Sequence, residues 1–188
     1  MTGQDIRFNI PNIISFCRLV SAPIAVWLIL NQIYAAAFWI FVSACVSDAA
    51  DGYIAKKFNL QTELGRFLDP IADKALLISV FVTLGQVDLI DTWLVILVVF
   101  RDALILCGAI LYHLLYGSLT MQPLLISKIN TTAQFILAAM VMGMSAFGLI
   151  NESGIIILTY FVAGTTFASG ASYVMTWGRK AMAMELGE

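Results

Sequence analysis

The chain has 188 residues, of which 61% are hydrophobic and 12% are charged, and its formal net charge is −2. Its mean hydropathy of +0.91 lies outside the range of most water-soluble domains and within that of membrane proteins. No basic or aromatic patch indicates a nucleic-acid partner. We therefore expect a single domain, residues 1–188, whose surroundings are mostly lipid.

Apolar stretches follow one another along the whole chain. A membrane-spanning helix needs about 20 mostly apolar residues, and the long runs of Leu, Ile, Val and Ala favour helices over strands. We predict six spanning helices, at residues 10–31, 34–55, 65–86, 92–116, 124–148 and 154–177. The expected fold class is an all-α integral membrane protein.

The first apolar stretch carries Arg18 and continues without a small-residue cleavage site. We interpret it as a retained span and not as a cleaved signal. The three cysteines, Cys17, Cys45 and Cys107, are scattered among the predicted helices. They predict neither a disulfide framework nor a zinc site.

Positive charges are distributed unevenly among the predicted loops. The connections after the first, third and fifth helices, near Asn31, Asp88 and Glu152, contain no Lys or Arg. Cations at the other ends of the helices are Arg7, Lys56, Lys57, Arg66, Arg179 and Lys180. The positive-inside rule then predicts that both termini are cytoplasmic.

Four aspartates lie where the second predicted helix ends and the third begins: Asp48, Asp51, Asp69 and Asp73. Spacings of three and four residues place each pair on one helix face. The short connection brings both faces to one depth, in a polar cavity that faces the cytoplasm. Converging carboxylates repel one another unless a counter-charge neutralises them. Hard divalent cations prefer such oxygen ligands and share them with substrate phosphates, so the pattern predicts a two-metal site.

Three other interpretations compete with a metal site. The acids could cap helix ends or pair with neighbouring cations, which are Lys56, Lys57, Arg66 and Lys74, but this accounts for one or two acids and hardly for four. A cation transporter would place its acids near the membrane midplane, between repeated halves. A noncatalytic scaffold needs no converging carboxylates.

The same interval carries an ordered motif, Asp48, two residues, Asp51–Gly52, two residues, Ala55–Lys56, eight residues, Gly65, three residues, Asp69, three residues and Asp73. This motif resembles the signature of the CDP-alcohol phosphotransferase family, DxxDGxxARx8GxxxDxxxD. Lys56 stands where the family has Arg, which retains the charge but not the forked guanidinium. The segments NIPNIISFCRL, FRDALIL and LISKINTTAQFIL are similar to the eukaryotic-type cardiolipin synthases of this family.

The resemblance implies an enzyme that transfers a phosphatidyl group from CDP-diacylglycerol to an alcohol and releases CMP. Members of the family have six transmembrane helices and generally form homodimers. By similarity Asp48, Asp51 and Asp69 hold two divalent cations, Mg²⁺ or Mn²⁺. Asp73 lies near a metal and acts as the general base on the acceptor hydroxyl. Nucleotide and phosphate binding is implied for Gly52, Ala55, Lys56 and Gly65.

Polar groups inside predicted spans are costly and usually face a cavity or a partner. We predict four acceptor-binding residues, Arg18, Arg66, Lys128 and Asn130. Arg101 and Asp102 lie deeper, where a structural ion pair or a dimer contact competes with catalysis. The single histidine, His113, is assigned no role. Small residues in AGTTFASGAS, residues 163–172, predict close helix packing.

The acceptor is predicted from charge. A soluble phosphomonoester carries about 1.5 to 2 negative charges, and holding it beside four aspartates needs a cluster of cations in a chain with ten Lys and Arg. Related phosphatidylglycerophosphate synthases commonly have a second basic residue where Asn130 stands. They also have an Arg late in the fourth helix, where this chain reads LCGAILYHLLYG.

Phosphatidylglycerol needs less positive charge, because its diester carries one charge and its acyl chains stay in the bilayer. The sequence therefore predicts a CMP-forming cardiolipin synthase, with a phosphatidylglycerophosphate synthase that uses glycerol 3-phosphate as the alternative. No presequence is visible, so we expect the bacterial inner membrane, with the mitochondrial inner membrane as the alternative.

Overall fold

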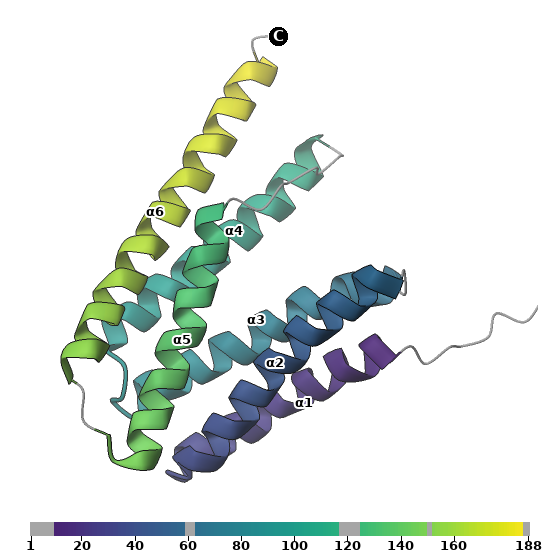
Figure 1. Cartoon of the computed structure of the whole chain (residues 1–188). Helices are drawn as coiled ribbons and strands as arrows, with labels where there is room; N and C mark the ends of the chain where they lie inside the picture. The colour runs from purple at the N-terminus through teal and green to yellow at the C-terminus, as the bar shows by residue number, and fades with distance from the viewer. Residues whose placement is uncertain (1–9, 59–62, 117–124, 150–151, 186–188) are drawn as a thin grey trace, which may run out of the picture. The chain divides into compact units, whose positions relative to one another are not determined.

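The structure is a computed structural model that describes residues 10–58, 63–116, 125–149 and 152–185. For residues 10–14, 49–58, 63–70, 109–116, 152 and 177–185 it describes the backbone alone. The described residues form six α-helices and no strand: α1 (Ile10–Leu30), α2 (Tyr34–Phe58), α3 (Glu63–Gln86), α4 (Thr92–Tyr116), α5 (Leu125–Phe147) and α6 (Glu152–Glu185). The prediction of six helices in an all-α protein is confirmed (Figure 1).

The helix surfaces are consistent with a membrane protein. Large apolar side chains lie exposed on every helix, and Trp39 is 61% exposed. Among the described residues, the stretches Leu125–Phe147 and Ser153–Thr176 are long and apolar enough to cross a membrane, judged by length and composition. Shorter apolar stretches are Ser15–Leu30 and Tyr34–Asp48. Six spans and cytoplasmic termini therefore stay predictions.

Hydroxyl side chains along the helices form hydrogen bonds within their own helix. Thr83 donates to the carbonyl of Ser79 at 2.7 Å, and Ser172 donates to the carbonyl of Ala168 at 2.7 Å. Such bonds satisfy polar groups that have no water to bind. These hydroxyls are therefore compatible with a lipid environment.

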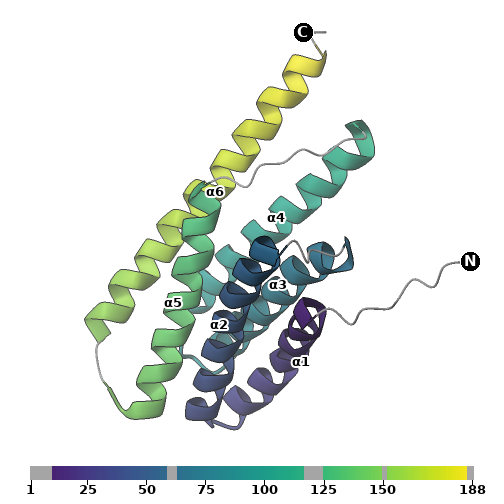
Figure 2. The ribbon, with the colours of Figure 1, turned by 45° about the vertical axis from the view of Figure 1, so that its right-hand side comes forward.

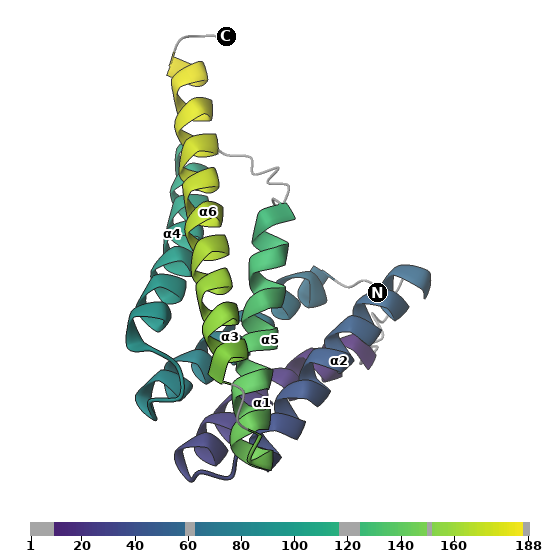
Figure 3. The ribbon, with the colours of Figure 1, turned by 60° about the vertical axis from the view of Figure 1, so that its left-hand side comes forward.

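Helix contacts divide the chain into two compact units. Unit 1 comprises Met1–Leu89 and Val141–Ile150, and unit 2 comprises Ile90–Met140 and Asn151–Glu188. In unit 1, α1 packs against both α2 and α3 (Figures 1 and 2). In unit 2, α4 packs along α6 (Figure 3). One domain over residues 1–188 stays a prediction.

The core of unit 1 explains how α1 reaches its two neighbours. Ala25 and Ile29 on α1, Phe41 on α2 and Phe81 and Leu84 on α3 are fully buried. A small residue such as Ala25 lets helix backbones approach closely. Arg18 lies about two turns before Ala25 on α1, and this packing places it against acids of both α2 and α3.

Three helices end with the same backbone turn. A residue with positive φ follows the helix, and the next N–H closes back onto a carbonyl five residues earlier, as in a Schellman motif. The positive-φ residues are Gln32, Asp88 and Gly148, and the closing bonds run from Ile33 to Leu28, Leu89 to Leu84 and Leu149 to Met144. These turns end α1 and α3 sharply and agree with the short connections predicted there.

Candidate active site

One arginine joins two of the predicted metal ligands. The Arg18 Nη1 atom of α1 lies 2.8 Å from the Asp48 Oδ1 atom of α2 and 2.6 Å from the Asp73 Oδ1 atom of α3. The structure therefore brings Arg18, Asp48 and Asp73 together, and both carboxylate oxygens lie within 2.8 Å of one nitrogen. Three helices of unit 1 supply one polar cluster, which we call the Arg18 cluster.

The arginine is buried while its acids are partly open. The Arg18 side chain is 2% exposed, whereas the Asp48 and Asp73 side chains are 42% and 31% exposed. The Arg18 Nε atom has no hydrogen-bond partner within the described residues. In the contacts described here, two partly exposed carboxylates share one buried guanidinium.

A small pocket adjoins the Arg18 cluster. It has a volume of about 200 Å³ and is lined by Cys17, Arg18, Ser21, Ile40, Ser43, Ala44 and Ser47. The Ser21, Ser43 and Ser47 hydroxyls donate to helix carbonyls at 2.6, 2.9 and 2.8 Å. A hydroxyl that donates still has oxygen lone pairs to accept from another donor. The pocket thus offers acceptor oxygens to a cationic group.

The side chains of the remaining motif residues, at positions 49–58 and 63–70, are outside the described part of α2 and α3. The backbone of α2 is helical through Asp51, Gly52, Ala55 and Lys56, and that of α3 is helical through Gly65, Arg66 and Asp69. The backbone is therefore helical at both pairs, as the predicted sharing of one helix face by Asp48 and Asp51, and by Asp69 and Asp73, requires. The roles of these residues stay predictions.

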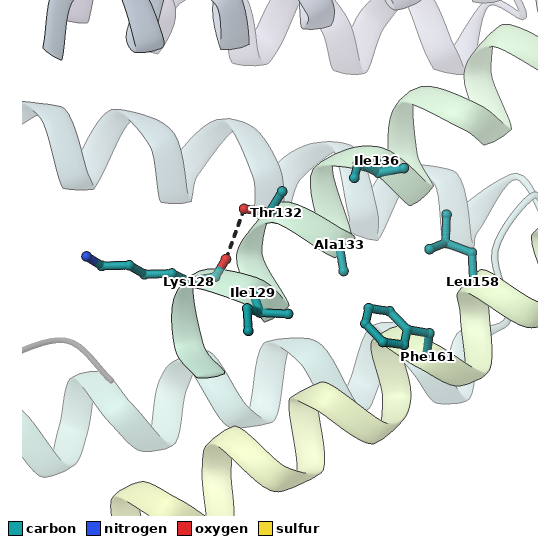
Figure 4. A pocket seen from close by; sticks show the side chains of 7 residues that line it. All are labelled: Lys128, Ile129, Thr132, Ala133, Ile136, Leu158 and Phe161. Carbon is teal, nitrogen blue, oxygen red and sulfur yellow. Dashed lines mark hydrogen bonds between the residues drawn. The ribbon is translucent and has the colours of Figure 1, made fainter. Parts of the chain in front are cut away.

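Lys128 stands at one end of an apolar groove in unit 2. The groove has a volume of about 330 Å³ and is lined by Lys128, Ile129, Thr132, Ala133, Ile136, Leu158 and Phe161. Figure 4 shows the Lys128 ammonium pointing away from the apolar lining, and the Thr132 hydroxyl donating to the Lys128 carbonyl at 3.0 Å. Lys128 is exposed and has no ion-pair partner among the described residues. The groove therefore combines an apolar wall with one unpaired positive charge.

Asn130 is placed differently from an exposed headgroup contact. It is fully buried, and its Oδ1 atom accepts hydrogen bonds from the hydroxyls of Thr165 at 2.9 Å and Thr166 at 2.8 Å. Its Nδ2 atom has no partner within the described residues. One turn later, Gln134 is also fully buried, and neither its Nε2 nor its Oε1 atom has a hydrogen-bond partner within the described residues. Asn130 therefore connects α5 to α6.

A second buried arginine lies in unit 2. The Arg101 Nη1 atom lies 2.6 Å from the Asp102 Oδ1 atom, and both side chains are 4% exposed. The Arg101 Nη2 atom donates to the Ser127 hydroxyl at 2.6 Å and to the Ser169 hydroxyl. We call this the Arg101 cluster. Of the alternatives predicted from the sequence, this geometry favours a structural ion pair.

Sequence reasoning missed the hydroxyl groups of α6. Thr165, Thr166 and Ser169 were expected only to allow close packing, yet they bind Asn130 and Arg101. The sequence held only part of this signal: the spacing of Thr165, Thr166 and Ser169 places their hydroxyls on one side of a helix, but it does not name their partners. His113 lies in the last part of α4, residues 109–116, where only the backbone is described.

Comparison with protein families decides between the classes of protein considered above. A family model described as CDP-alcohol phosphatidyltransferase matches residues 8–178. The chain belongs to this family. The resemblance drawn from the aspartate motif is therefore confirmed, and the match covers the helices that carry both acids of the Arg18 cluster.

Three similar proteins illustrate two kinds of enzyme name within the CDP-alcohol phosphatidyltransferase family. A chloroplastic CDP-diacylglycerol–glycerol-3-phosphate 3-phosphatidyltransferase 1 of Oryza sativa subsp. japonica is 34% identical over 194 residues, covering 92% of this chain and 58% of its own. The cardiolipin synthase (CMP-forming) of Homo sapiens is 33% identical over 189 residues, covering 92% and 62%. The CDP-diacylglycerol–glycerol-3-phosphate 3-phosphatidyltransferase of Rickettsia typhi is 32% identical over 171 residues, covering 88% and 94%. The chain thus spans less than two thirds of the first two relatives.

The divalent cations implied by the family resemblance fit the residues of the Arg18 cluster. Asp48 and Asp73 supply carboxylate oxygens, which are the ligands that Mg²⁺ and Mn²⁺ prefer. Both oxygens already gather around a positive group, so a cation suits this position. Within the described side chains no group of three or more His, Cys, Asp and Glu is gathered. The full set of ligands stays a prediction, because the Asp51 and Asp69 side chains lie outside that part.

Proposed function

We propose that this chain transfers a phosphatidyl group from CDP-diacylglycerol to a hydroxyl of phosphatidylglycerol, giving cardiolipin and CMP. The observation that carries the proposal is the meeting of Asp48 and Asp73, from two helices, in a chain of this family. Partly exposed, paired carboxylates suit a reaction that needs both metal ligands and a base.

Asp73 is assigned as the base of the reaction. The acceptor oxygen attacks the phosphorus of the phosphatidyl group, its proton passes to the Asp73 carboxylate, and the bond from phosphorus to the CMP oxygen breaks with its electron pair. The Asp73 side chain is 31% exposed, which lets a hydroxyl approach. A base must lie within hydrogen-bond reach of the proton it removes.

Asp48, Asp51, Asp69 and Asp73 are assigned to hold the metal ions. Bound Mg²⁺ or Mn²⁺ supplies positive charge that polarises the phosphoryl oxygens and stabilises the departing CMP. The support from geometry is that the Asp48 and Asp73 oxygens already point at one cationic group. The helical backbone adds Asp51 and Asp69 to the same faces of α2 and α3.

The nucleotide and its phosphates are assigned to the motif residues that follow Asp51, namely Gly52, Ala55, Lys56 and Gly65. Gly52 and Ala55 share one face of α2, because they are three residues apart in a helix. Their small side chains leave the helix backbone accessible to a ligand. Lys56 adds a positive charge one residue beyond Ala55.

The groove beside Lys128 supports phosphatidylglycerol as the acceptor. Its apolar lining suits an acyl chain, and one unpaired ammonium suits a phosphodiester with one negative charge. Acceptor binding by Arg18 and Arg66 stays a prediction from the sequence. Asn130 is not assigned to the acceptor here, because it is fully buried, lies outside the groove lining, and its Oδ1 atom accepts hydrogen bonds from Thr165 and Thr166.

Glycerol 3-phosphate is the second candidate acceptor. The relatives from Oryza sativa subsp. japonica and Rickettsia typhi carry names that state this acceptor. A dianion bound beside several aspartates needs more than one positive side chain. The groove supplies one, Lys128, within the described residues.

The two acceptors are separated by supplying each one alone. Purified protein in detergent is given CDP-diacylglycerol, Mg²⁺ and either acceptor, and the lipid products and CMP are measured. We expect cardiolipin from phosphatidylglycerol and CMP release that chelation of the metal abolishes. Phosphatidylglycerophosphate without cardiolipin would contradict the acceptor, and no CMP release with either would contradict the activity.

Two substitutions test the groove itself. Lys128→Met removes the charge, which is worth about 1 kcal/mol or roughly a fivefold rise in KM for phosphatidylglycerol. Ile136→Trp fills the groove from a side chain that is 53% exposed, and we expect KM for phosphatidylglycerol to rise while KM for CDP-diacylglycerol stays unchanged. Ile157→Trp, at a position 70% exposed on α6 and outside the groove lining, is the matched control.

The setting of the reaction is proposed from the family and the charge pattern. We place the chain in the bacterial inner membrane as a homodimer, with the Arg18 cluster toward the cytoplasm and the mitochondrial inner membrane as the alternative. Cysteines introduced near Asn31 and at Arg179, in a background without the native cysteines, are labelled from either side of sealed vesicles. Labelling of both from the same side would contradict this orientation.

A further inference from the structure

We infer that Arg18 is an internal counter-cation that divalent metal ions displace from Asp48 and Asp73. The Arg18 side chain then moves into the serine-lined pocket between α1 and α2. The inference rests on the metal role of these acids in the proposed function. It adds a residue of α1 that sets metal affinity without binding the metal.

The first step is that arginine and metal compete for the same atoms. The Asp48 and Asp73 Oδ1 atoms both lie within 2.8 Å of Arg18 Nη1. A divalent ion that binds these oxygens lies about 2.0 to 2.6 Å from them. Two cations on the same oxygens are then only a few ångströms apart, where like charges repel strongly in a partly buried site. Metal binding and the present Arg18 contacts therefore oppose each other.

The second step is that Arg18 cannot avoid the repulsion by losing its proton. A guanidinium stays protonated in proteins, and the Arg18 side chain is 2% exposed. Its buried Nε atom has no partner within the described residues. In its present position Arg18 thus leaves the Nε–H donor without an acceptor. Once the acids bind a metal, a position in which Nε–H also finds an acceptor becomes the more favourable one for Arg18.

The third step is that a place for the displaced side chain exists. Arg18 itself lines the pocket of about 200 Å³ together with Ser21, Ser43 and Ser47. Their hydroxyls donate to helix carbonyls, so their oxygens remain able to accept from a guanidinium. Because Arg18 itself lines the pocket, its side chain reaches these oxygens by a change of rotamer.

The first experiment removes the counter-cation. Mn²⁺ is titrated into purified protein without substrate, and free Mn²⁺ is measured by electron paramagnetic resonance. When Arg18 occupies Asp48 and Asp73, only the remaining fraction of the protein can bind Mn²⁺, which lowers the apparent Mn²⁺ affinity by that fraction. We therefore expect Arg18→Gln to bind Mn²⁺ at least about fivefold more tightly than wild type. Arg18→Lys retains the charge without bridging both acids, and we expect a smaller increase in affinity.

The Arg101 cluster supplies the matched control. Arg101→Lys weakens another buried arginine–aspartate pair, and we expect Mn²⁺ affinity equal to that of wild type. If Arg18→Gln does not fold, Arg18→Lys still decides the question. Wild-type affinity in both Arg18 variants, or weaker binding in either, would overturn the inference.

The second experiment fills the pocket. Ser43→Leu places a larger side chain in its lining from an exposed position of α2, and we expect weaker Mn²⁺ binding because Arg18 has less room. Val46→Leu, at a position 62% exposed on the same helix and outside the pocket lining, is the control with no expected change. Unchanged affinity in Ser43→Leu would overturn the pocket as the destination of Arg18.

The failure of this inference is distinguishable from failure of the proposed function. Equal Mn²⁺ affinity in wild type and all variants overturns the role of Arg18 alone. Wild-type protein that binds no Mn²⁺ overturns the role of Arg18 and the metal role of the aspartates together.

Discussion

Two buried arginines in this chain have different surroundings. In unit 1, Arg18 is shared by Asp48 and Asp73, which come from two other helices and are 42% and 31% exposed. In unit 2, Arg101 pairs with the adjacent Asp102, whose side chain is 4% exposed, and donates to hydroxyls of α5 and α6. The first cluster has two acids for one guanidinium, and the second has one.

The difference separates a binding site from a structural contact. The Arg101 cluster is balanced in charge and closed, so an added cation has no acid to bind within its described contacts. In the Arg18 cluster the two carboxylates come from different helices and are partly exposed, so a cation can reach them. A buried, balanced pair contributes to structure, and removing one partner leaves a charge without compensation.

The largest effect is expected from replacing Asp73, the proposed general base in the Arg18 cluster. In Asp73→Asn the amide retains the shape but cannot take the proton, so we expect phosphatidyl transfer to fall by about 10² to 10⁴. The measurement is CMP release from CDP-diacylglycerol in detergent, with nucleotide binding measured beside it. Binding should stay largely intact, and activity above a third of wild type would contradict the assignment.

Breaking the Arg101 cluster should instead reduce stability. Arg101→Met leaves Asp102 buried without its cation, which costs about 3 to 5 kcal/mol of unfolding free energy. Thermal unfolding in detergent measures the loss. We expect Arg101→Met with Asp102→Leu to recover most of it, since both charges are then absent, and activity per folded protein to stay near wild type. A double variant as unstable as Arg101→Met would contradict a structural ion pair.

The smallest effects are expected on stability, when Gly143 or Gly170 inside a helix is replaced by Ala. A methyl group at Gly170 would lie 3.6 Å from Arg101 Cγ, an ordinary contact, whereas at Gly143 it would lie 3.2 Å from the Phe38 ring. Gly170→Ala should raise the unfolding free energy by about 0.5 to 1 kcal/mol, because Ala loses less conformational entropy than Gly on folding. Gly143→Ala should gain less or lose, because the ring must move. A higher melting temperature for Gly143→Ala than for Gly170→Ala would contradict this packing.

Much of the fold could be predicted from apolar stretches alone. The second predicted helix ended at residue 55 and the sixth at residue 177, whereas α2 continues to Phe58 and α6 to Glu185. The apolar criterion stops at charged residues, but Ala, Lys, Met and Glu are strong helix formers and continue the helix. Helix number was therefore predictable, and helix ends were less so.

The contacts of the site could be predicted only in part. Spacing placed Asp48 and Asp73 on helix faces, but not Arg18 against them, because periodicity leaves the rotation and depth of α1 undetermined. Buried residues such as Ala25 and Phe81 fix that register through packing. The bonds of Thr165 and Thr166 to Asn130 likewise depend on the register of α5 with α6.

The central claim is that the Arg18 cluster binds divalent metal and the Arg101 cluster does not. The most direct test titrates Mn²⁺ into wild type, the double variant Asp48→Asn with Asp73→Asn, and Asp102→Asn, and measures bound Mn²⁺ by electron paramagnetic resonance. We predict that the double variant loses Mn²⁺ binding while Asp102→Asn binds as wild type does. Retained binding in the double variant, or loss in Asp102→Asn alone, would contradict the account.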